Sequence, residues 1–313
     1  MGNIKEIRKR IDSISDTQKI TNAMYLISST KLRKARKMLG DTEPFFYATK
    51  EMIGRLVSNL PEGVQNVFLE DKAGIPEEKK KRGYIVITDD KGLAGSYNHN
   101  VLRAVEEKLK DDKSNWKLFV IGEVGRYHFT TKNMDVEQSF LFTSQNPTLH
   151  RARKISAEII DDYQERRIDE FYIAYTAMKG GTCETVFEKL LPLDFITDLH
   201  EKTKAKNGLY LDEFLMEPSP SAILDNIVPN YITGFIYGAL VESFCSVQHS
   251  RMQAMDSANK NAQKMLDSLK LRYNRQRQAM ITQEITEVVS GAKALKKSKE
   301  ARERAMKRQE VKH

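Results

Sequence analysis

The chain has 313 residues, of which 40% are hydrophobic, 8% aromatic and 30% charged. This composition supplies a hydrophobic core and argues against disorder of the whole chain. No segment has an uninterrupted run of about 18 to 20 apolar residues, which a membrane span requires. The net charge of +8 is concentrated at the ends: residues 1–58 carry 12 Lys and Arg against 6 Asp and Glu, and residues 208–313 carry 16 against 12. Basic ends suit an acidic partner or a nucleic acid.

The N-terminal segment predicts a long amphipathic helix over residues 1–58. Its first apolar residues repeat at the three-and-four spacing of one helix face. They are Ile4, Ile7, Ile11 and Ile14. The pattern continues to Leu32, and Gly40 and Pro44 then predict a kink or an interruption before the helix resumes.

Residues 59–207 have the composition of a small α/β domain. Short β-branched and aromatic runs predict strands at 84–88, 118–121 and 171–175, and helical spacing lies between them at 100–109 and 151–163. This alternation predicts a mainly parallel sheet.

The chain shows no pattern typical of a catalytic, nucleotide or metal site. The turn at residues 88–96 has the glycines of neither the dinucleotide fingerprint nor the P-loop, so we interpret it as a tight structural turn. The six histidines lack metal-ligand spacing, and the widely separated Cys183 and Cys245 are interpreted as small hydrophobes in a reducing compartment. The acidic pairs Asp89-Asp90 and Asp161-Asp162 are predicted to be solvated charges. The function is therefore expected to lie in surfaces.

The C-terminal segment predicts a second long helix over residues 208–295, opened by Pro218 and Pro220. Small and flexible apolar side chains form a seam along it. They are Met252, Met255, Ala258, Ala262, Met265 and Leu269. A helix of at least 65 residues spans on the order of 100 Å, which is too long for a simple globule. The two end helices are expected to pair antiparallel, and the apolar seam itself requires no more than a passive coiled-coil stalk or spacer.

Several segments, in order along residues 2–295, resemble the gamma subunit of F-type ATP synthases, the central rotor shaft. The segments that carry the resemblance are residues 17–24 (TQKITNAM), 30–35 (TKLRKA), 90–98 (DKGLAGSYN), 252–255 (MQAM) and 277–287 (RQAMITQEITE). The resemblance implies a shaft of two paired terminal helices and a central Rossmann-like α/β domain. It also implies a subunit that is not an enzyme, has no cofactor or metal, and drives changes of nucleotide affinity in beta subunits as it turns.

The resemblance also implies the partners and the location. The partners are the alpha and beta subunits of the catalytic ring, the epsilon subunit and the membrane c-ring, with no nucleic acid and no direct insertion into the membrane. Because Met1 directly precedes Gly2-Asn3-Ile4 without a transit peptide, we expect a bacterial subunit, peripheral at the cytoplasmic face of the cell membrane.

The resemblance assigns contact and coupling roles to eight residues. Arg277 and Gln278 match a polar pair that hydrogen-bonds a loop of a beta subunit, and Thr282 and Glu284 match positions that influence coupling. Met24 matches a shaft position that faces beta. The basic residues Lys31, Arg33 and Lys34, extended by Arg36 and Lys37, match a stretch that passes an acidic loop of beta; a solvated helix face is the alternative for them.

Residues 296–313 form a basic extension beyond the usual end of the family, and we expect them to be mobile. Residues 292–313 hold nine Lys and Arg against three Asp and Glu. Two other functions remain open on the sequence. One is the shaft of a paralogous F-like rotary ATPase that does not make ATP, and the other is a nucleic-acid-binding coiled coil, favoured only by the basic ends.

Overall fold

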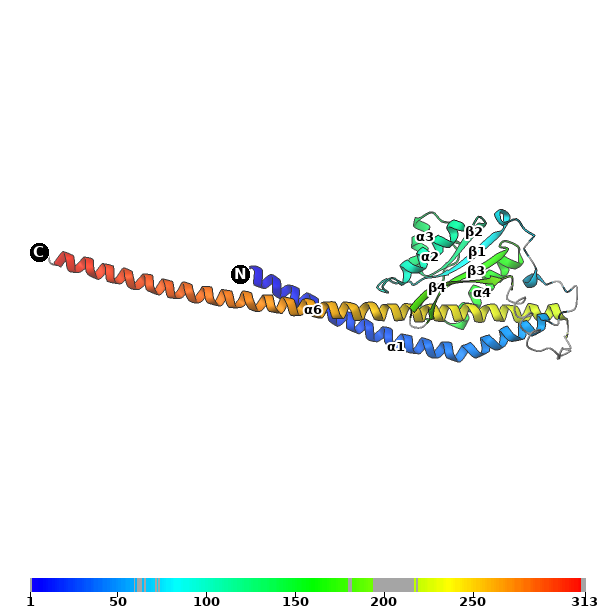
Figure 1. Ribbon diagram of the computed structural model, residues 1–313, viewed down its shortest axis with the longest axis horizontal. Coiled ribbons are helices and arrows are strands. Elements are labelled where there is room, and N and C mark those ends of the chain that lie inside the picture. The colour runs from blue at the N-terminus through cyan, green and yellow to red at the C-terminus, as the bar shows by residue number, and fades with distance from the viewer. Residues whose placement is uncertain are drawn as a thin grey trace. The chain divides into compact units, whose positions relative to one another are not determined.

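The computed structural model describes residues 2–58, 60, 64, 66–70, 72, 74–179, 182–193, 217 and 219–310 (Figure 1). These residues divide into two compact units, Met24–Ala254 and the pair of segments Met1–Ala23 and Met255–His313. The predicted features at residues 194–207, at residues 208–216 and at Pro218 lie outside the described residues. None of the helices in the described residues combines the length and the apolar character that a membrane span requires.

Helix α1 (Gly2–Ser58) is an α-helix over its whole length. It continues through Gly40 and Pro44, so the helix is not interrupted there, and the kink near Pro44 stays a prediction. Pro44 is exposed, and so is Gly40 four residues earlier. The carbonyl of Gly40, which loses its helical partner because proline has no N–H, can therefore bind water.

Helix α6 (Pro220–Glu310) is 91 residues long. Ser219 caps it, because its hydroxyl accepts a hydrogen bond from Ala222 N at 3.2 Å, and Pro220 occupies the first helical position. The helix continues beyond residue 295, so residues 296–310 of the basic extension are helical.

The α/β part contains a four-stranded sheet with the order β2-β1-β3-β4. The strands are β1 (Lys81–Ile87), β2 (Asn115–Ile121), β3 (Glu170–Lys179) and β4 (Thr182–Leu191). β1 pairs in parallel with β2 and β3, whereas β4 pairs antiparallel with β3. The sheet is thus mainly parallel, and the antiparallel β4 is an addition to the predicted strands.

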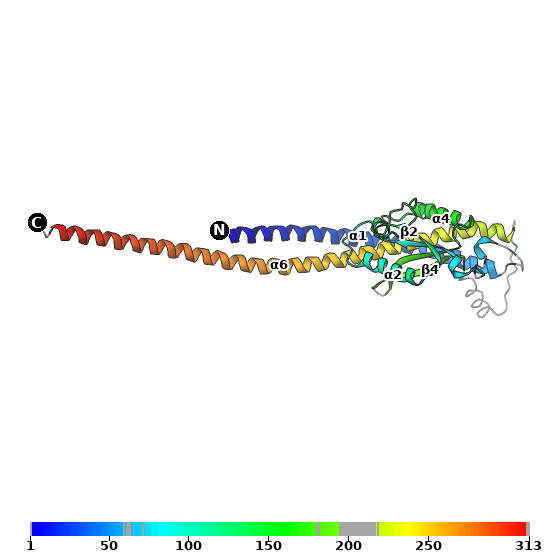
Figure 2. The same cartoon turned by 90° about the horizontal axis from the view of Figure 1, so that it is seen from above.

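Helices cover both faces of this sheet (Figure 2). Helix α2 (Tyr97–Asp111) packs on one face, where Val101 and Val105 meet Val86 and Val120. The short helix α3 (Glu123–Thr131) contributes Phe129 to the same core. The other face lies against helix α4 (Leu149–Gln164) and against the parts of α1 and α6 that belong to the Met24–Ala254 unit. The α/β part and both long helices therefore share one hydrophobic core.

In the other compact unit, the start of α1 lies beside the middle of α6. Gln18 Nε2 donates to Gln263 Oε1 at 3.2 Å, and the Thr21 hydroxyl donates to Asn259 Oδ1. The residue numbers of the partners rise along α1 and fall along α6, so the two segments are antiparallel. Polar side chains, together with the buried Ala262 and Leu266, form this contact.

Candidate functional site

The uncovered stretch of α6 runs from Arg277 to Glu300, beyond the part from Leu269 to Gln276 that lies beside Glu6, Ile7 and Arg10 of α1. Every residue in it is exposed or half-buried. Its exposed large apolar side chains include a stripe with the four-three spacing of one helix face, in which Ile281, Ile285 and Val288 are 48%, 59% and 72% exposed. Leu295 continues the stripe. A helix with an apolar face in water is stabilised when a partner buries that face.

Four of the predicted contact residues lie on this uncovered stretch, and all four are exposed: Arg277, Gln278, Thr282 and Glu284. The Thr282 hydroxyl donates to Gln278 O at 3.0 Å, which is a bond within the helix. Within the part of the chain that the structure describes, the side chains of Arg277, Gln278 and Glu284 form no hydrogen bond or ion pair. Arg277 and Glu284 share the face of Ile281, so charged and apolar groups alternate along it.

The other predicted contact residues lie on α1. Leu32 and Ala35 are buried in the core, so Arg33 and Lys34 between them are exposed, while Met24 and Lys31 are half-buried. Across the described residues, no ion pair involves Lys31, Arg33 or Lys34. The basic stretch therefore keeps its charge available to an acidic partner. The structure shows this exposure, and the roles of these residues in coupling remain predictions.

The turn after β1 is tied to α6 rather than open to a ligand. Asp89 is only 1% exposed and forms an ion pair with Arg251, which is 8% exposed. The prediction of a solvated Asp89 is therefore wrong, because α6 supplies a buried cation from 162 residues away. Gly95 has φ +58°, a conformation that suits glycine, and a Cβ there would lie 3.7 Å from Ala254 Cβ. The turn has a structural role, as the sequence predicted.

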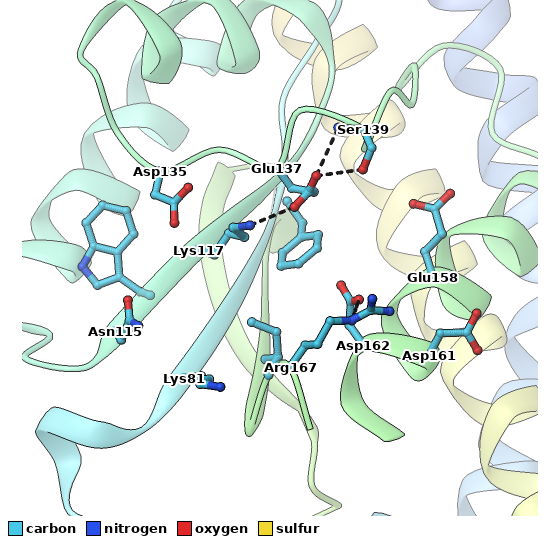
Figure 3. Close-up of a pocket in the computed structure, with 13 residues that line it drawn as sticks. Lys81, Asn115, Lys117, Asp135, Glu137, Ser139, Glu158, Asp161, Asp162 and Arg167 are labelled. Carbon is cyan, nitrogen blue, oxygen red and sulfur yellow. Dashed lines mark hydrogen bonds and ion pairs between the residues drawn. The ribbon is translucent and has the colours of Figure 1, made fainter. Parts of the chain in front are cut away.

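A charged cleft of about 620 Å³ lies at the amino-terminal ends of β1 and β2 (Figure 3). Lys117 Nζ donates to Glu137 Oε2 at 2.9 Å, and this bond together with those from Ser139 lowers the pKa of Glu137 to about 2. On the α4 wall, burial raises the pKa of Asp162, although Arg167 lies 2.8 Å away. Asp161 is exposed as predicted, whereas Asp162 is half-buried and paired.

The two cysteines are both free thiols. Cys245 is buried, and burial raises its pKa to about 11, whereas Cys183 is half-buried. The interpretation as a small hydrophobe fits Cys245 better than Cys183. Among the described residues, no group of three His, Cys, Asp or Glu side chains is arranged to hold a metal ion.

Comparisons with known proteins match nearly the whole chain. A family model described as ATP synthase matches residues 3–295. The ATP synthase gamma chain of Ruminiclostridium cellulolyticum is 45% identical over 94% of this chain and 99% of its own length. A sodium ion specific ATP synthase gamma chain of Acetobacterium woodii is 40% identical, with 94% and 99% covered. In a solved structure of the Euglena gracilis mitochondrial ATP synthase, one chain has a similar fold with a TM-score of 0.66, at 16% identity and with 94% and 95% covered.

Proposed function

The chain belongs to the ATP synthase gamma chain family, and on this premise we propose that it is the central rotor shaft of an F-type ATP synthase. In this role it couples transmembrane ion flow to ATP synthesis, or hydrolysis to rotation, at catalytic sites in the beta subunits. The chain itself carries no catalytic site. The match over nearly the full length of relatives named ATP synthase gamma chain favours this function over a paralogous shaft or a nucleic-acid-binding coiled coil.

The observation that carries the proposal is the uncovered stretch of α6. A helix that exposes Ile281, Ile285, Val288 and Leu295 over the 24 residues from Arg277 to Glu300 needs a surrounding partner to bury that surface. A ring of alternating alpha and beta subunits supplies such a sleeve. Apolar and charged groups alternate along the stretch. The apolar contacts would allow α6 to rotate within the ring, and a few polar contacts would form hydrogen bonds to the ring subunits at particular angles.

We assign the polar contacts to residues whose side chains bond to no other segment of the described chain. The planar fork of Arg277 suits a bidentate bond to a carboxylate of a beta subunit, and Gln278 adds an amide beside it. Thr282 and Glu284, one turn further along, adjust the strength of this contact. On α1, Met24 faces beta, and Lys31, Arg33 and Lys34 attract an acidic loop by charge alone, which requires no fixed geometry.

The coupling has a simple thermodynamic requirement. Rotation changes the nucleotide affinity of a beta subunit only if each orientation of the shaft contacts each conformation of that subunit with a different free energy. A helix with Arg277, Ile281 and Glu284 on one face and Arg275 and Gln276 on others presents a different surface to each of three beta subunits. As the shaft turns, this asymmetry of the side chains selects the conformations of each beta subunit one after another.

The remaining parts have supporting roles in this proposal. Residues 1–58 and 208–295 form an antiparallel coiled-coil shaft, supported by the Gln18–Gln263 and Thr21–Asn259 contacts. Residues 59–207 form a Rossmann-like domain that binds the epsilon subunit and the membrane c-ring. Residues 296–310 extend the shaft as a basic helical end. The protein is peripheral at the cytoplasmic face of the cell membrane.

Reconstitution with the cognate alpha and beta subunits tests the proposal. We expect a complex of alpha and beta subunits around this chain that rotates on ATP. The double variant Arg277→Ala, Gln278→Ala should slow ATP-driven rotation about tenfold, because a charged hydrogen bond contributes about 1.5 kcal/mol or more.

The double variant Arg275→Ala, Gln276→Ala is a matched control, since it removes the same types of side chain two residues earlier, where they lie beside Glu6, Ile7 and Arg10 of α1. It should rotate at nearly the rate of the unaltered chain. Absence of a complex from folded subunits would contradict the proposed function, and equal slowing by both variants would contradict the assignment to Arg277 and Gln278.

A further inference from the structure

The turn after β1 carries one of the segments by which the chain resembles its family, and the contact surfaces of the shaft leave this turn without a role. In the structure it is part of a buried ion pair. Arg251 Nη2 donates to Asp89 Oδ2 and, at 3.3 Å, to the carbonyl oxygen of Gly92. We propose that Arg251 is a positioning residue that fixes the rotational angle of α6 against the α/β sheet, so that torque passes between them; this inference rests on the proposed function.

Asp89 is held in place by its own network. Its Oδ1 accepts hydrogen bonds from Asp90 N at 2.9 Å and from Gln145 Nε2 at 2.6 Å, and its backbone N–H donates to Asn98 Oδ1 at 3.0 Å. The carboxylate therefore has a fixed direction before α6 meets it. A fixed acceptor constrains where the guanidinium of Arg251 lies, and through it the rotation of the helix.

A second row of polar bonds joins the same part of α6 to β3. The pairing of β3 with β1 ends at Ala174, and beyond it the backbone of β3 bonds to side chains of α6. Thr176 N donates to Ser243 Oγ at 3.2 Å, and Ser246 Oγ donates to Thr176 O at 3.1 Å. Met178 N donates to a carboxylate oxygen of Glu242 at 3.3 Å. Helix α6 thus supplies partners that a neighbouring strand would otherwise supply.

These polar contacts differ in kind from the earlier contacts of α6. Between Leu224 and Ile236 the helix is held mainly by fully buried aliphatic side chains, which supply free energy but little directional preference. A buried ion pair contributes little net stability relative to apolar residues of the same size, but its hydrogen bonds require one orientation. We therefore infer that residues 242–251 fix the rotational angle of α6 relative to the sheet, whereas the buried aliphatic residues supply most of the free energy of packing.

The position of the ion pair along α6 suits a transfer of torque. Arg251 precedes by three residues the end of the Met24–Ala254 unit, and Gly95 brings the same turn against Ser250 and Ala254. Torque that arises in α6 beyond Ala254 passes into the α/β part at Ala254 or at a residue with a lower number, such as Arg251. A contact with a defined angle here limits twisting of the helix within the domain.

The test uses the assembled rotating complex and the double variant Asp89→Asn, Arg251→Met. This variant removes both buried charges, so neither is left without its partner. A bead is attached to the α/β part through Lys108→Cys in a Cys183→Ser background, because Lys108 is exposed and Cys245 is buried. We expect the angular distribution of the bead at each dwell to broaden, and the number of ions pumped per ATP to fall.

The matched control is Ser156→Ala, Thr233→Val, which removes the buried 2.8 Å hydrogen bond between α4 and the apolar part of α6. It should lower stability without changing the dwell width or the pumping ratio. If the Asp89, Arg251 variant assembles and has the dwell width and pumping ratio of the unaltered chain, the positioning role is wrong. If both variants broaden the dwell equally, the effect is general loosening and the positioning role is again wrong.

A third variant decides the matter if the double variant does not assemble. Arg251→Lys keeps the charge but replaces the planar guanidinium by a flexible ammonium group. It should assemble and broaden the dwell, and an unaltered dwell width would overturn the inference. Failure of the unaltered chain to form a rotating complex would instead contradict the proposed function, so the two failures are distinguishable.

Discussion

The two halves of helix α6 differ in what surrounds them. Over residues 220–254 the helix is buried against the α/β sheet and α1, with Leu224, Val228 and Ile232 fully inaccessible to solvent. Over residues 277–300 every residue except the half-buried Met280 is exposed, although Ile281 and Ile285 are as apolar as the residues of the first half. The first half is a component of this chain's own core. Among the described residues, no other segment buries the apolar face of the second half, so we attribute this face to the proposed contact with a partner protein.

The largest expected effect comes from truncating a side chain in the buried half. Ile232→Ala should lower the free energy of unfolding of the isolated chain by about 2–5 kcal/mol, because it leaves a cavity in a closed core. Urea unfolding followed by circular dichroism measures this loss. A loss below about 1 kcal/mol would show that the buried half is less tightly packed than its inaccessibility indicates.

An intermediate effect is expected in cysteine reactivity. Burial raises the pKa of Cys245 from its ordinary value of 9.0 to about 11, which lowers its thiolate fraction at pH 8 roughly a hundredfold. In a Cys183→Ser, Val288→Cys chain, maleimide at pH 8 should therefore label residue 288 and leave Cys245 intact. The labelling of Cys245 should rise as the pH approaches 11.

Mass spectrometry of the labelled peptides measures the two rates. The same chain unfolded in urea is the control, since both thiols are then exposed and should react alike. Comparable labelling of the two sites in the folded chain would contradict the difference between the halves.

The smallest expected effect comes from the exposed half. Ile285→Ala should change the free energy of unfolding of the isolated chain by less than about 0.5 kcal/mol, because its side chain is already in contact with water. The same variant should assemble less tightly with alpha and beta subunits, where the stripe is buried. Unfolding curves of the isolated chain and the yield of complex at limiting concentration measure the two quantities. A stable complex with unaltered affinity would mean that the stripe faces away from the ring.

Periodicity alone located the elements with strong local patterns. The strands β1, β2 and β3 and the helices α1, α2, α4 and α6 all follow runs or spacings that are visible in the sequence. Helix α3 was not predicted because it has only nine residues and follows β2 directly through Gly122, which has φ +98°. Strand β4 was not predicted because Glu184 and Glu188 interrupt its apolar residues. Both elements have weak local patterns, and contacts with the rest of the fold stabilise them.

The candidate site was predictable to the extent that it depends on single helices. The exposure of Arg277 and Gln278 follows from their position on a long polar helix, and the exposure of Arg33 and Lys34 follows from the buried Leu32 beside them. The pairing of Asp89 with Arg251 was not predictable, because no spacing relates residues that lie 162 positions apart. Local patterns indicate which face is exposed, whereas buried charges depend on which segments meet.

The bonds from α6 to the backbone of β3 have a consequence for biosynthesis. Until residues 242–246 leave the ribosome, Thr176 and Met178 belong to a strand whose hydrogen-bonding groups have no partner on that side. The core beneath the sheet also lacks Leu224 through Cys245 until then. The α/β part is thus completed only after about three quarters of the chain has been translated, and during that interval its open strand is a template for pairing with other chains. Translation of the last quarter therefore protects the nascent protein from aggregation as well as building the shaft.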